Sequence, residues 1–171
     1  DHAPYMRGVA DAIGLCGGEE TEPFLHQGMV PLSETCIILS PTADTWQEAN
    51  GRKADGREKL DLYCMLTQEN IPVDVLDSSD LGLFIKGYKA AYFVDMNMER
   101  RSAGALAEWA RDGGVLCLWD GAASRDEYNE PLDVFPTEPG ERPFGKGMIV
   151  RFADRPAAIW WEKTLALNKT T

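Results

Sequence analysis

Five short apolar runs recur along the chain, and each has the length of one buried strand. All of them are rich in β-branched or aromatic residues: TCIILS (35–40), PVDVL (72–76), AAYFVD (90–95), GVLCLW (114–119) and MIVRF (148–152). Continuous apolar runs of roughly four to eight residues are typical of strands that are covered on both faces. The pattern therefore predicts a five-stranded sheet at the centre of the fold.

Between several of these runs, apolar positions recur with a helical period. Before the second run, one helix face is expected to carry Leu60, Tyr63, Cys64 and Thr67. Asp55, with Glu58 three residues later, is suited to the N-cap of this helix, and Asn70 is suited to its end. A second helix is expected between the third and fourth runs, ending before Gly113-Gly114. Its apolar positions are Ala103, Leu106, Ala107 and Ala110.

Strands that alternate with helices indicate parallel pairing through right-handed crossovers. The expected fold is a three-layer, flavodoxin-like α/β domain with a parallel five-stranded sheet in the order 2-1-3-4-5. We expect this domain to span residues 33–171, with an N-terminal helical segment (1–32) packing on it. Pro and Gly residues predict a long loop over 129–147, and the apolar residues of 155–167, with two adjacent tryptophans, predict a closing helix.

The charge balance narrows the range of partners. The 171 residues include 17 Lys and Arg against 28 Asp and Glu, which gives a formal net charge of −11. Such a charge repels nucleic acid and anionic membranes, and no apolar run reaches the roughly 18 residues of a membrane-spanning helix. We therefore expect a soluble protein, in a cytoplasmic or extracytoplasmic compartment. Because the sequence begins with Asp inside a helical pattern, we expect it to be part of a longer protein.

The sequence predicts neither a metal site nor a bound cofactor. No C-x-x-C pair occurs among Cys16, Cys36, Cys64 and Cys117. These thiols are therefore expected to serve as core packing. A flavin phosphate is usually held by a glycine-rich turn, but residues 40–46, after the first strand, contain no glycine. We expect the purified protein to be colourless.

Polar residues follow three of the predicted strands, at the sheet edge where ligands bind in open parallel sheets. They belong to the segments SPTADTW (40–46), DMNME (95–99) and DGAASRDEYN (120–129). The candidate binding residues are Ser40, Thr42, Asp95, Asn97, Asp120 and Glu127. One interpretation is a solvated acidic surface. The other is that carboxylates, including that of Asp126, gather at one rim as in a small-molecule-binding or hydrolytic site.

Within the third of these segments, two side chains are expected to hold the loop in place. Arg125 is expected to pair with an acidic neighbour, and Tyr128 is expected to anchor the loop. Both expectations are structural and involve no ligand.

Three segments of the chain resemble a known family. They are GYKAAYFVD (87–95), LAEWARDGGVL (106–116) and GKGMIVRF (145–152), and with the strand pattern they extend the resemblance over roughly residues 33–153. Here the chain resembles the class I glutamine amidotransferase-like domains. It most resembles the degenerate type found as the trimerisation domain of bacterial β-galactosidases. The resemblance implies a flavodoxin-like domain of a larger bacterial protein that acts on carbohydrate.

The residues around the fourth strand depart from the active members of that family. Their nucleophile motif reads G-x-C-x-G. In CLWDG (117–121), Cys117 takes the place of the first glycine, Trp119 that of the nucleophile, and Gly121 that of the last glycine. The family's histidine follows this motif, whereas both histidines of this chain, His2 and His26, precede the first strand. We therefore expect no amidotransferase activity, and a Cys117 thiol that is buried in the strand and unreactive.

These observations favour a non-catalytic amidotransferase-like module that serves domain packing or oligomerisation. Its expected partners are other domains of the parent protein or further copies of the chain. The second interpretation is a binding or hydrolytic domain that uses the acidic rim for carbohydrate or another small molecule. A glycosidase-like neighbour in the complete gene product would favour the first.

Overall fold

The computed structural model describes residues 33–51 and 56–153, together with Arg7, Asp11 and Gly14. The chain divides into two units, Asp1–Leu32 and Ser33–Thr171, and the second contains the sheet with its helices. The predicted closing helix with Trp160 and Trp161 lies outside the described residues, as does most of the predicted N-terminal helix.

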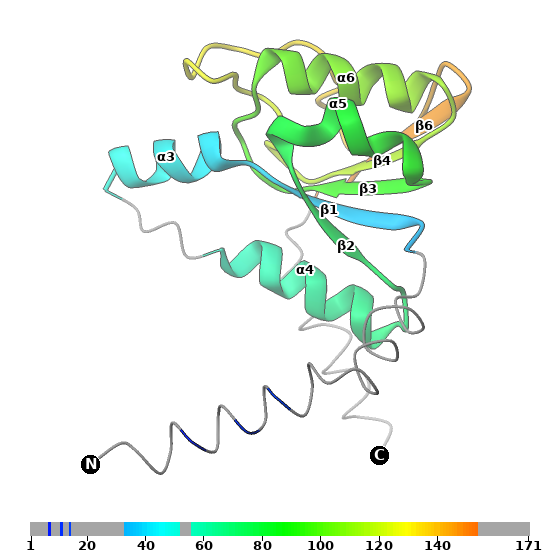
Figure 1. Ribbon diagram of the computed structural model, residues 1–171. Helices are drawn as coiled ribbons and strands as arrows, with labels where there is room; N and C mark the ends of the chain where they lie inside the picture. Colours follow the sequence, from blue (N-terminus) through cyan, green and yellow to red (C-terminus); the bar gives the residue numbers. More distant parts are fainter. Residues whose placement is uncertain (1–6, 8–10, 12–13, 15–32, 52–55, 154–171) are drawn as a thin grey trace, which may run out of the picture. The chain divides into compact units, whose positions relative to one another are not determined.

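The sheet has six strands in the order β2-β1-β3-β4-β6-β5 (Figure 1). Five of them are parallel: β1 (Thr35–Leu39), β2 (Asp74–Asp77), β3 (Ala90–Phe93), β4 (Val115–Leu118) and β6 (Gly147–Arg151). These are the five predicted strands, and they neighbour one another as predicted. The α/β fold class is therefore confirmed, with a sixth strand added to the predicted order.

The additional strand, β5 (Gly140–Phe144), pairs antiparallel with β6 and forms the edge of the sheet. The prediction of one continuous loop over 129–147 was therefore wrong. Pro143 is tolerated because edge strands leave one side of the backbone unpaired. The turn into β6 requires glycine at position 145, where φ is +68° and an added Cβ would lie 2.5 Å from the Arg111 carbonyl oxygen.

Helices cover both faces of the sheet. On one face lie α6 (Arg100–Arg111) and the short α5 (Leu81–Phe84), which is flanked by the 3₁₀ turns η1 (Ser78–Asp80) and η2 (Ile85–Gly87). The other face is covered by α4 (Arg57–Gln68), while α3 (Pro41–Ala49) follows β1 directly (Figure 1). Helix α3 was not predicted from the sequence. It begins at a Ser40 N-cap followed by Pro41.

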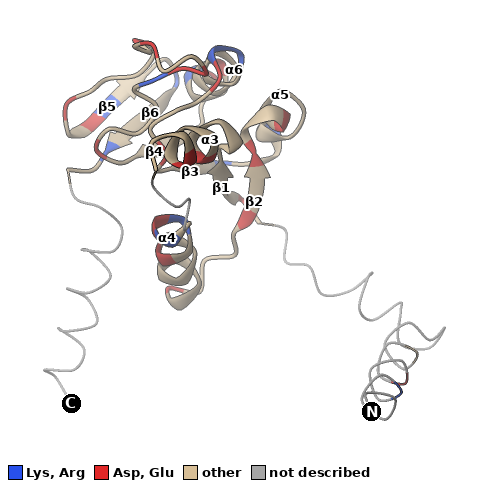
Figure 2. Ribbon diagram, turned by 90° about the vertical axis from the view of Figure 1, so that its left-hand side faces the viewer, with Lys and Arg blue, Asp and Glu red and all other residues tan. Residues whose placement is uncertain are grey.

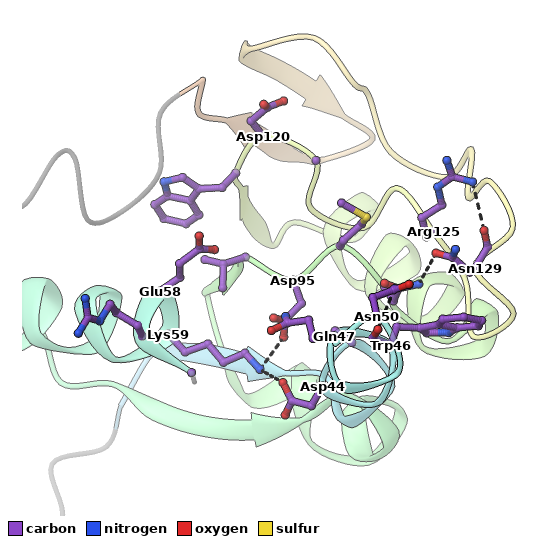
Figure 3. A pocket seen from close by; sticks show the side chains of 18 residues that line it. Asp44, Trp46, Gln47, Asn50, Glu58, Lys59, Asp95, Asp120, Arg125 and Asn129 are labelled. Atoms are coloured by element: carbon purple, nitrogen blue, oxygen red, sulfur yellow. Dashed lines mark hydrogen bonds and ion pairs between the residues drawn. The ribbon is translucent and has the colours of Figure 1, made fainter. Parts of the chain in front are cut away.

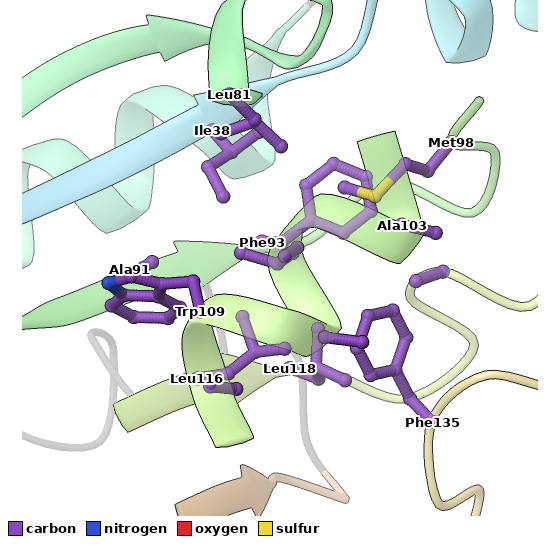
Figure 4. Close-up of a cluster of buried hydrophobic side chains, with 14 of the residues drawn as sticks. Ile38, Leu81, Ala91, Phe93, Met98, Ala103, Trp109, Leu116, Leu118 and Phe135 are labelled. Atoms are coloured by element: carbon purple, nitrogen blue, oxygen red, sulfur yellow. The ribbon is translucent and has the colours of Figure 1, made fainter. Parts of the chain in front are cut away.

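Two hydrophobic cores hold these layers together. The larger lies between the sheet and helices α5 and α6, with Phe93, Trp109 and Leu118 among its members (Figure 4). As predicted, α6 buries Ala103, Leu106, Ala107 and Ala110. The smaller core, on the α4 face, consists of Ile37, Leu62, Leu66, Val94, Cys117 and Trp119.

Helix α4 presents a different face to the sheet from the one predicted. Leu62 and Leu66 are buried, whereas Leu60 is 60% exposed and Tyr63 is also exposed. The N-cap is Gly56, in a left-handed conformation, and Asp55 lies outside the described residues. The predicted end is confirmed, because Asn70 adopts a left-handed φ of 56° just beyond the helix.

Acidic side chains are distributed over α3, α4, β2 and the loops that lead to β5 (Figure 2). None of the helices in the described part of the chain is long and apolar enough to cross a membrane.

Candidate functional site

A cavity of about 710 Å³ lies at the carboxyl ends of β3 and β4, between α3 and the first turn of α4 (Figure 3). This is the sheet edge where the sequence predicted a ligand site. The wall is mainly polar and includes Asp44, Gln47, Lys59, Asp95, Asp120 and Asn129. Cavities that bind small molecules usually measure about 300 to 1,000 Å³, so this one has room for such a ligand.

Asp95 follows β3, and its side chain is only 4% exposed. One carboxylate oxygen, Oδ2, accepts the Ser40 backbone N–H at 3.1 Å and lies 3.1 Å from the Lys59 ammonium. Burial raises the pKa of Asp95 to about 6, because the Lys59 charge and the Ser40 N–H offset only part of the desolvation and the Asp44 charge adds to it. Asp95 therefore exchanges its proton close to neutral pH.

Lys59 connects three elements around the cavity. From α4, its ammonium lies 2.7 Å from Oδ1 of Asp44 on α3 and 3.1 Å from Asp95 after β3. Burial alone would lower the pKa of Lys59, but the hydrogen bond to Asp44 and the charge of Asp95 outweigh it and raise that pKa. Lys59 therefore stays charged, and both carboxylates share its charge.

Of the candidate residues, Asp95, Asn97 and Asp120 line the cavity, as does Trp119. The other three make contacts that hold secondary structure. Ser40 is buried and its hydroxyl accepts the Ala43 N–H at 3.2 Å, which caps α3.

Thr42 and Glu127 are the remaining two candidates. The Thr42 hydroxyl donates to Glu99, whose other carboxylate oxygen accepts the Ser78 hydroxyl at 2.9 Å. Glu127 accepts the backbone N–H of Arg100, at the start of α6, at 2.8 Å. Carboxylates at a helix N-terminus stabilise the helix dipole, so these contacts fasten α6 to its surroundings.

Asp126 lies inside the loop that follows β4. Its side chain is 1% exposed: Oδ1 accepts the N–H groups of Tyr128 and Glu130, at 2.9 and 2.8 Å, and Oδ2 lies 2.6 Å from Nε of Arg100. Burial would raise the pKa of Asp126, but the N–H groups of Glu130 and Tyr128 and the Arg100 charge together hold it below its usual range. Asp126 is therefore the anchor of this loop and not part of a catalytic rim.

Two expectations for the same loop were wrong. Arg125 donates from Nη1 to the backbone carbonyl of Asn129 at 3.1 Å and not to an acidic neighbour. Tyr128 is exposed and does not anchor the loop. Asn97 supports the loop as well, since its Nδ2 donates to the Asp126 carbonyl at 3.1 Å and to Asn129 Oδ1 at 3.2 Å.

Trp119, at the position of the family's nucleophile, is buried. Its ring stacks on Phe152, with ring centroids 4.7 Å apart, and it also contacts the Tyr92 ring. Cys117 is buried in β4 on the same face as Trp119, as predicted. Burial raises the pKa of the Cys117 thiol to about 12, despite a hydrogen bond with Tyr92 that lowers it. A neutral thiol under an aromatic layer is a poor nucleophile.

Lys59, Asp44 and Gln47 are among the cavity residues that were not candidates in the sequence. Lys59 precedes Leu62 and Leu66 on the buried face of α4. A charged residue at the start of an apolar stripe was the available signal, because a buried Lys needs a carboxylate partner.

Neither a protein-family model nor a curated protein sequence matches the chain. Solved structures do. A GH42 β-galactosidase from G. stearothermophilus superimposes with a TM-score of 0.59 at 12% identity, over 82% of this chain and 31% of that one. The β-galactosidase from Rahnella sp. R3 superimposes with a TM-score of 0.58 at 13% identity, over 79% of this chain and 31% of that one. The exo-carrageenase GH42 from Bacteroides ovatus superimposes with a TM-score of 0.58 at 13% identity, over 90% of this chain and 19% of that one.

The chain therefore shares its α/β fold with one part of these longer proteins. It spans about a third of the length of the two β-galactosidases and about a fifth of the carrageenase. At this level of identity, the likeness establishes the fold, while function depends on the site.

Proposed function

We propose that this chain is a non-catalytic, amidotransferase-like module of a larger bacterial carbohydrate-active protein, and that it serves domain packing or oligomerisation. One observation carries the proposal: 82% of this chain superimposes on only 31% of the length of a GH42 β-galactosidase. A fold that recurs as one part of glycoside hydrolases is expected to work beside a catalytic domain.

The region after β4 supports a non-catalytic role. Active amidotransferase-like domains need an exposed thiol at the strand-to-helix turn, with a histidine within reach. Here Trp119 occupies that position, and the nearby Cys117 is buried. Both histidines precede β1 in the sequence.

Exposed apolar residues near the β2 edge support a packing role. Leu83 is 75% exposed and Phe84 is exposed beside it on α5, which contacts β2. Val75, on the edge strand β2 itself, is exposed too. Because Val75 pairs with Ile37 and so lies on the α4 face of the sheet, Leu83 and Phe84 form the apolar pair that suits a protein–protein contact.

Sedimentation velocity of the 171-residue chain and of the complete gene product tests the proposal. We expect the chain to be monomeric or weakly associating and the complete protein to form a stable oligomer. Replacing Leu83 and Phe84 with Asp in the complete protein should shift it to smaller species. The control Leu60→Asp, at an exposed apolar position on α4, should leave the oligomer unchanged. A complete protein that stays monomeric would contradict the oligomerisation role.

A further inference from the structure

The inner wall of the cavity contains charges that are already matched. Lys59 is shared by Asp44 and Asp95 at 2.7 and 3.1 Å. Asp120, at the other side, acts electrostatically on Arg151, whose guanidinium is buried and donates to the Trp119 carbonyl at 2.8 Å. At this inner wall, a ligand with a net charge would therefore meet partners that are neutralised within the protein, while Arg125, on the loop side of the cavity, donates to the Asn129 carbonyl at 3.1 Å.

The start of α3 is unsuited to an anion. In related architectures a helix N-terminus after the first strand is the usual phosphate site. Here the Ser40 N–H donates to the Asp95 carboxylate at 3.1 Å, and the Ser40 hydroxyl caps Ala43. The protein's own carboxylate therefore takes the place that a phosphate would occupy, and its charge repels an incoming anion.

The rest of the wall offers donors and acceptors side by side. Amide groups come from Gln47 and Asn50 on α3 and from Asn129 in the loop after β4. Asn50 Nδ2 donates to the Trp46 carbonyl at 2.9 Å and Asn129 Oδ1 accepts Asn97 Nδ2 at 3.2 Å, so Asn50 offers the cavity its oxygen and Asn129 its amino group.

The Asp120 carboxylate, drawn apart from these amides in Figure 3, adds an acceptor. Met96, which is largely exposed, adds an apolar surface. A hydroxyl group both donates and accepts, so vicinal hydroxyls match such a wall.

From this geometry we infer that the cavity between α3, α4 and the ends of β3 and β4 binds a neutral polyhydroxylated molecule of monosaccharide size. Hydroxyls would bond to the amides and to Asp120, and the C–H face would lie on Met96. This binding function is independent of the packing role, because the cavity is built entirely within one chain.

Saturation-transfer NMR on the 171-residue chain tests this inference. The neutral probes are D-galactose, D-glucose, D-mannose, myo-inositol and D-sorbitol. D-galacturonate and D-galactosamine carry a negative or a positive charge on the same ring as galactose. We expect saturable binding of at least one neutral probe, and binding of the charged analogues about 10-fold weaker or absent.

Two variants and one control locate the site. Asp120→Asn and Gln47→Ala should each weaken binding of that neutral probe about 10-fold, because the first replaces a charged acceptor by a weaker neutral amide oxygen and the second removes an amide group from the wall. Asp112→Asn changes an exposed carboxylate at the end of α6, outside the cavity, and should leave the affinity unchanged. All three positions lie at the surface or at the cavity wall, and circular dichroism checks that each variant folds.

Three results would overturn the inference. The first is that none of the five neutral probes saturates. The second is that a charged analogue binds more tightly than its neutral parent. The third is that Asp112→Asn weakens binding as much as Asp120→Asn. The oligomeric state measured by sedimentation is a separate readout, so the packing proposal stands or falls on its own.

Discussion

Two buried aspartates at the same edge of the sheet respond to burial in opposite ways. Asp95 and Asp126 are 4% and 1% exposed, and each lies beside one cationic side chain. Burial raises the pKa of Asp95 to about 6, whereas the pKa of Asp126 lies below its usual range. Burial alone therefore does not determine how a carboxylate behaves.

Two things differ: Asp95 is desolvated more strongly, and Asp126 has more donors. Asp126 accepts two backbone N–H groups from its own loop in addition to the Arg100 bond. Asp95 accepts one, from Ser40, and its cation Lys59 is shared with Asp44. Hydrogen bonds to the charged form stabilise it. The loop after β4 is thus closed around its carboxylate, while Asp95 at the cavity has fewer donors and a raised pKa.

The largest expected effect comes from removing the loop anchor. Asp126→Ala should lower the melting temperature by about 10 °C, because two buried N–H groups and the Arg100 guanidinium lose their acceptor. Differential scanning calorimetry measures it. Asp126→Asn is the matched control. Its amide oxygen can still accept both N–H groups, so this variant should lower the melting temperature less than Asp126→Ala does. Equal losses for the two variants would show that the ion pair, and not the loop geometry, holds the segment.

The second expectation concerns pH. The folded pKa of Asp95, about 6, lies above its ordinary value of 3.8, so the folded state binds the additional proton between these values. Its contribution to stability is fully present below about pH 4 and is lost as pH rises through 6. The loss reaches at most ~3 kcal/mol, at about 1.4 kcal/mol per pKa unit.

Urea unfolding of the native chain and of Asp95→Asn, from pH 4 to 7.5, measures this contribution. The variant should gain stability relative to the native chain as pH rises. Asp126→Asn should show the reverse in an added series below pH 4, because the lowered pKa of Asp126 contributes stability that is present above about pH 4 and is lost on further acidification. If the Asp95→Asn and native curves run parallel, Asp95 does not titrate in this range.

A smaller change in melting temperature is expected to distinguish Lys59 from Arg100. Lys59→Met should lower the melting temperature at pH 8 by about 6 °C, because Asp95 then remains charged with only the Ser40 N–H. Arg100→Met should cost no more than about 3 °C, because Arg100 is 57% exposed and Asp126 keeps both backbone donors. Lys59→Met should also be better tolerated at pH 5, where Asp95 accepts a proton. A larger loss for Arg100→Met would reverse the comparison.

The sequence was most informative where burial required a continuous apolar pattern. Strands β1, β3 and β4 and helix α6 are covered on their apolar faces, and their residues show the matching apolar pattern in the sequence. The edge strand β5 reads GERPF and needs no such pattern, because it is paired on one side only. It therefore resembled a loop.

The place of three cavity residues could be predicted from the chain order. Asp95, Asn97 and Asp120 follow strands whose carboxyl ends must meet in a parallel sheet, so the chain order alone brings them together. Lys59 was missed because Leu60 and Tyr63 offer a competing helical stripe, and only tertiary packing selects Leu62 and Leu66. The role of Asp126 depends on the backbone geometry of its own loop, which residue types do not reveal.

The smallest expected effect is at Cys117. It lies in β4, two residues before Trp119, and belongs to the same core as that residue. If the cavity stays a surface feature, iodoacetamide at neutral pH should leave Cys117 unmodified in the native state, because the thiol is buried and its pKa is raised to about 12. Cys64 on α4 is only half-buried and is the internal comparison, expected to react first, with both sites read by peptide mass spectrometry. Rapid, stoichiometric labelling of Cys117 would mean that the reagent reaches the α4-side core in the native state, and the contrast between a polar cavity at the strand ends and a closed interior would no longer hold.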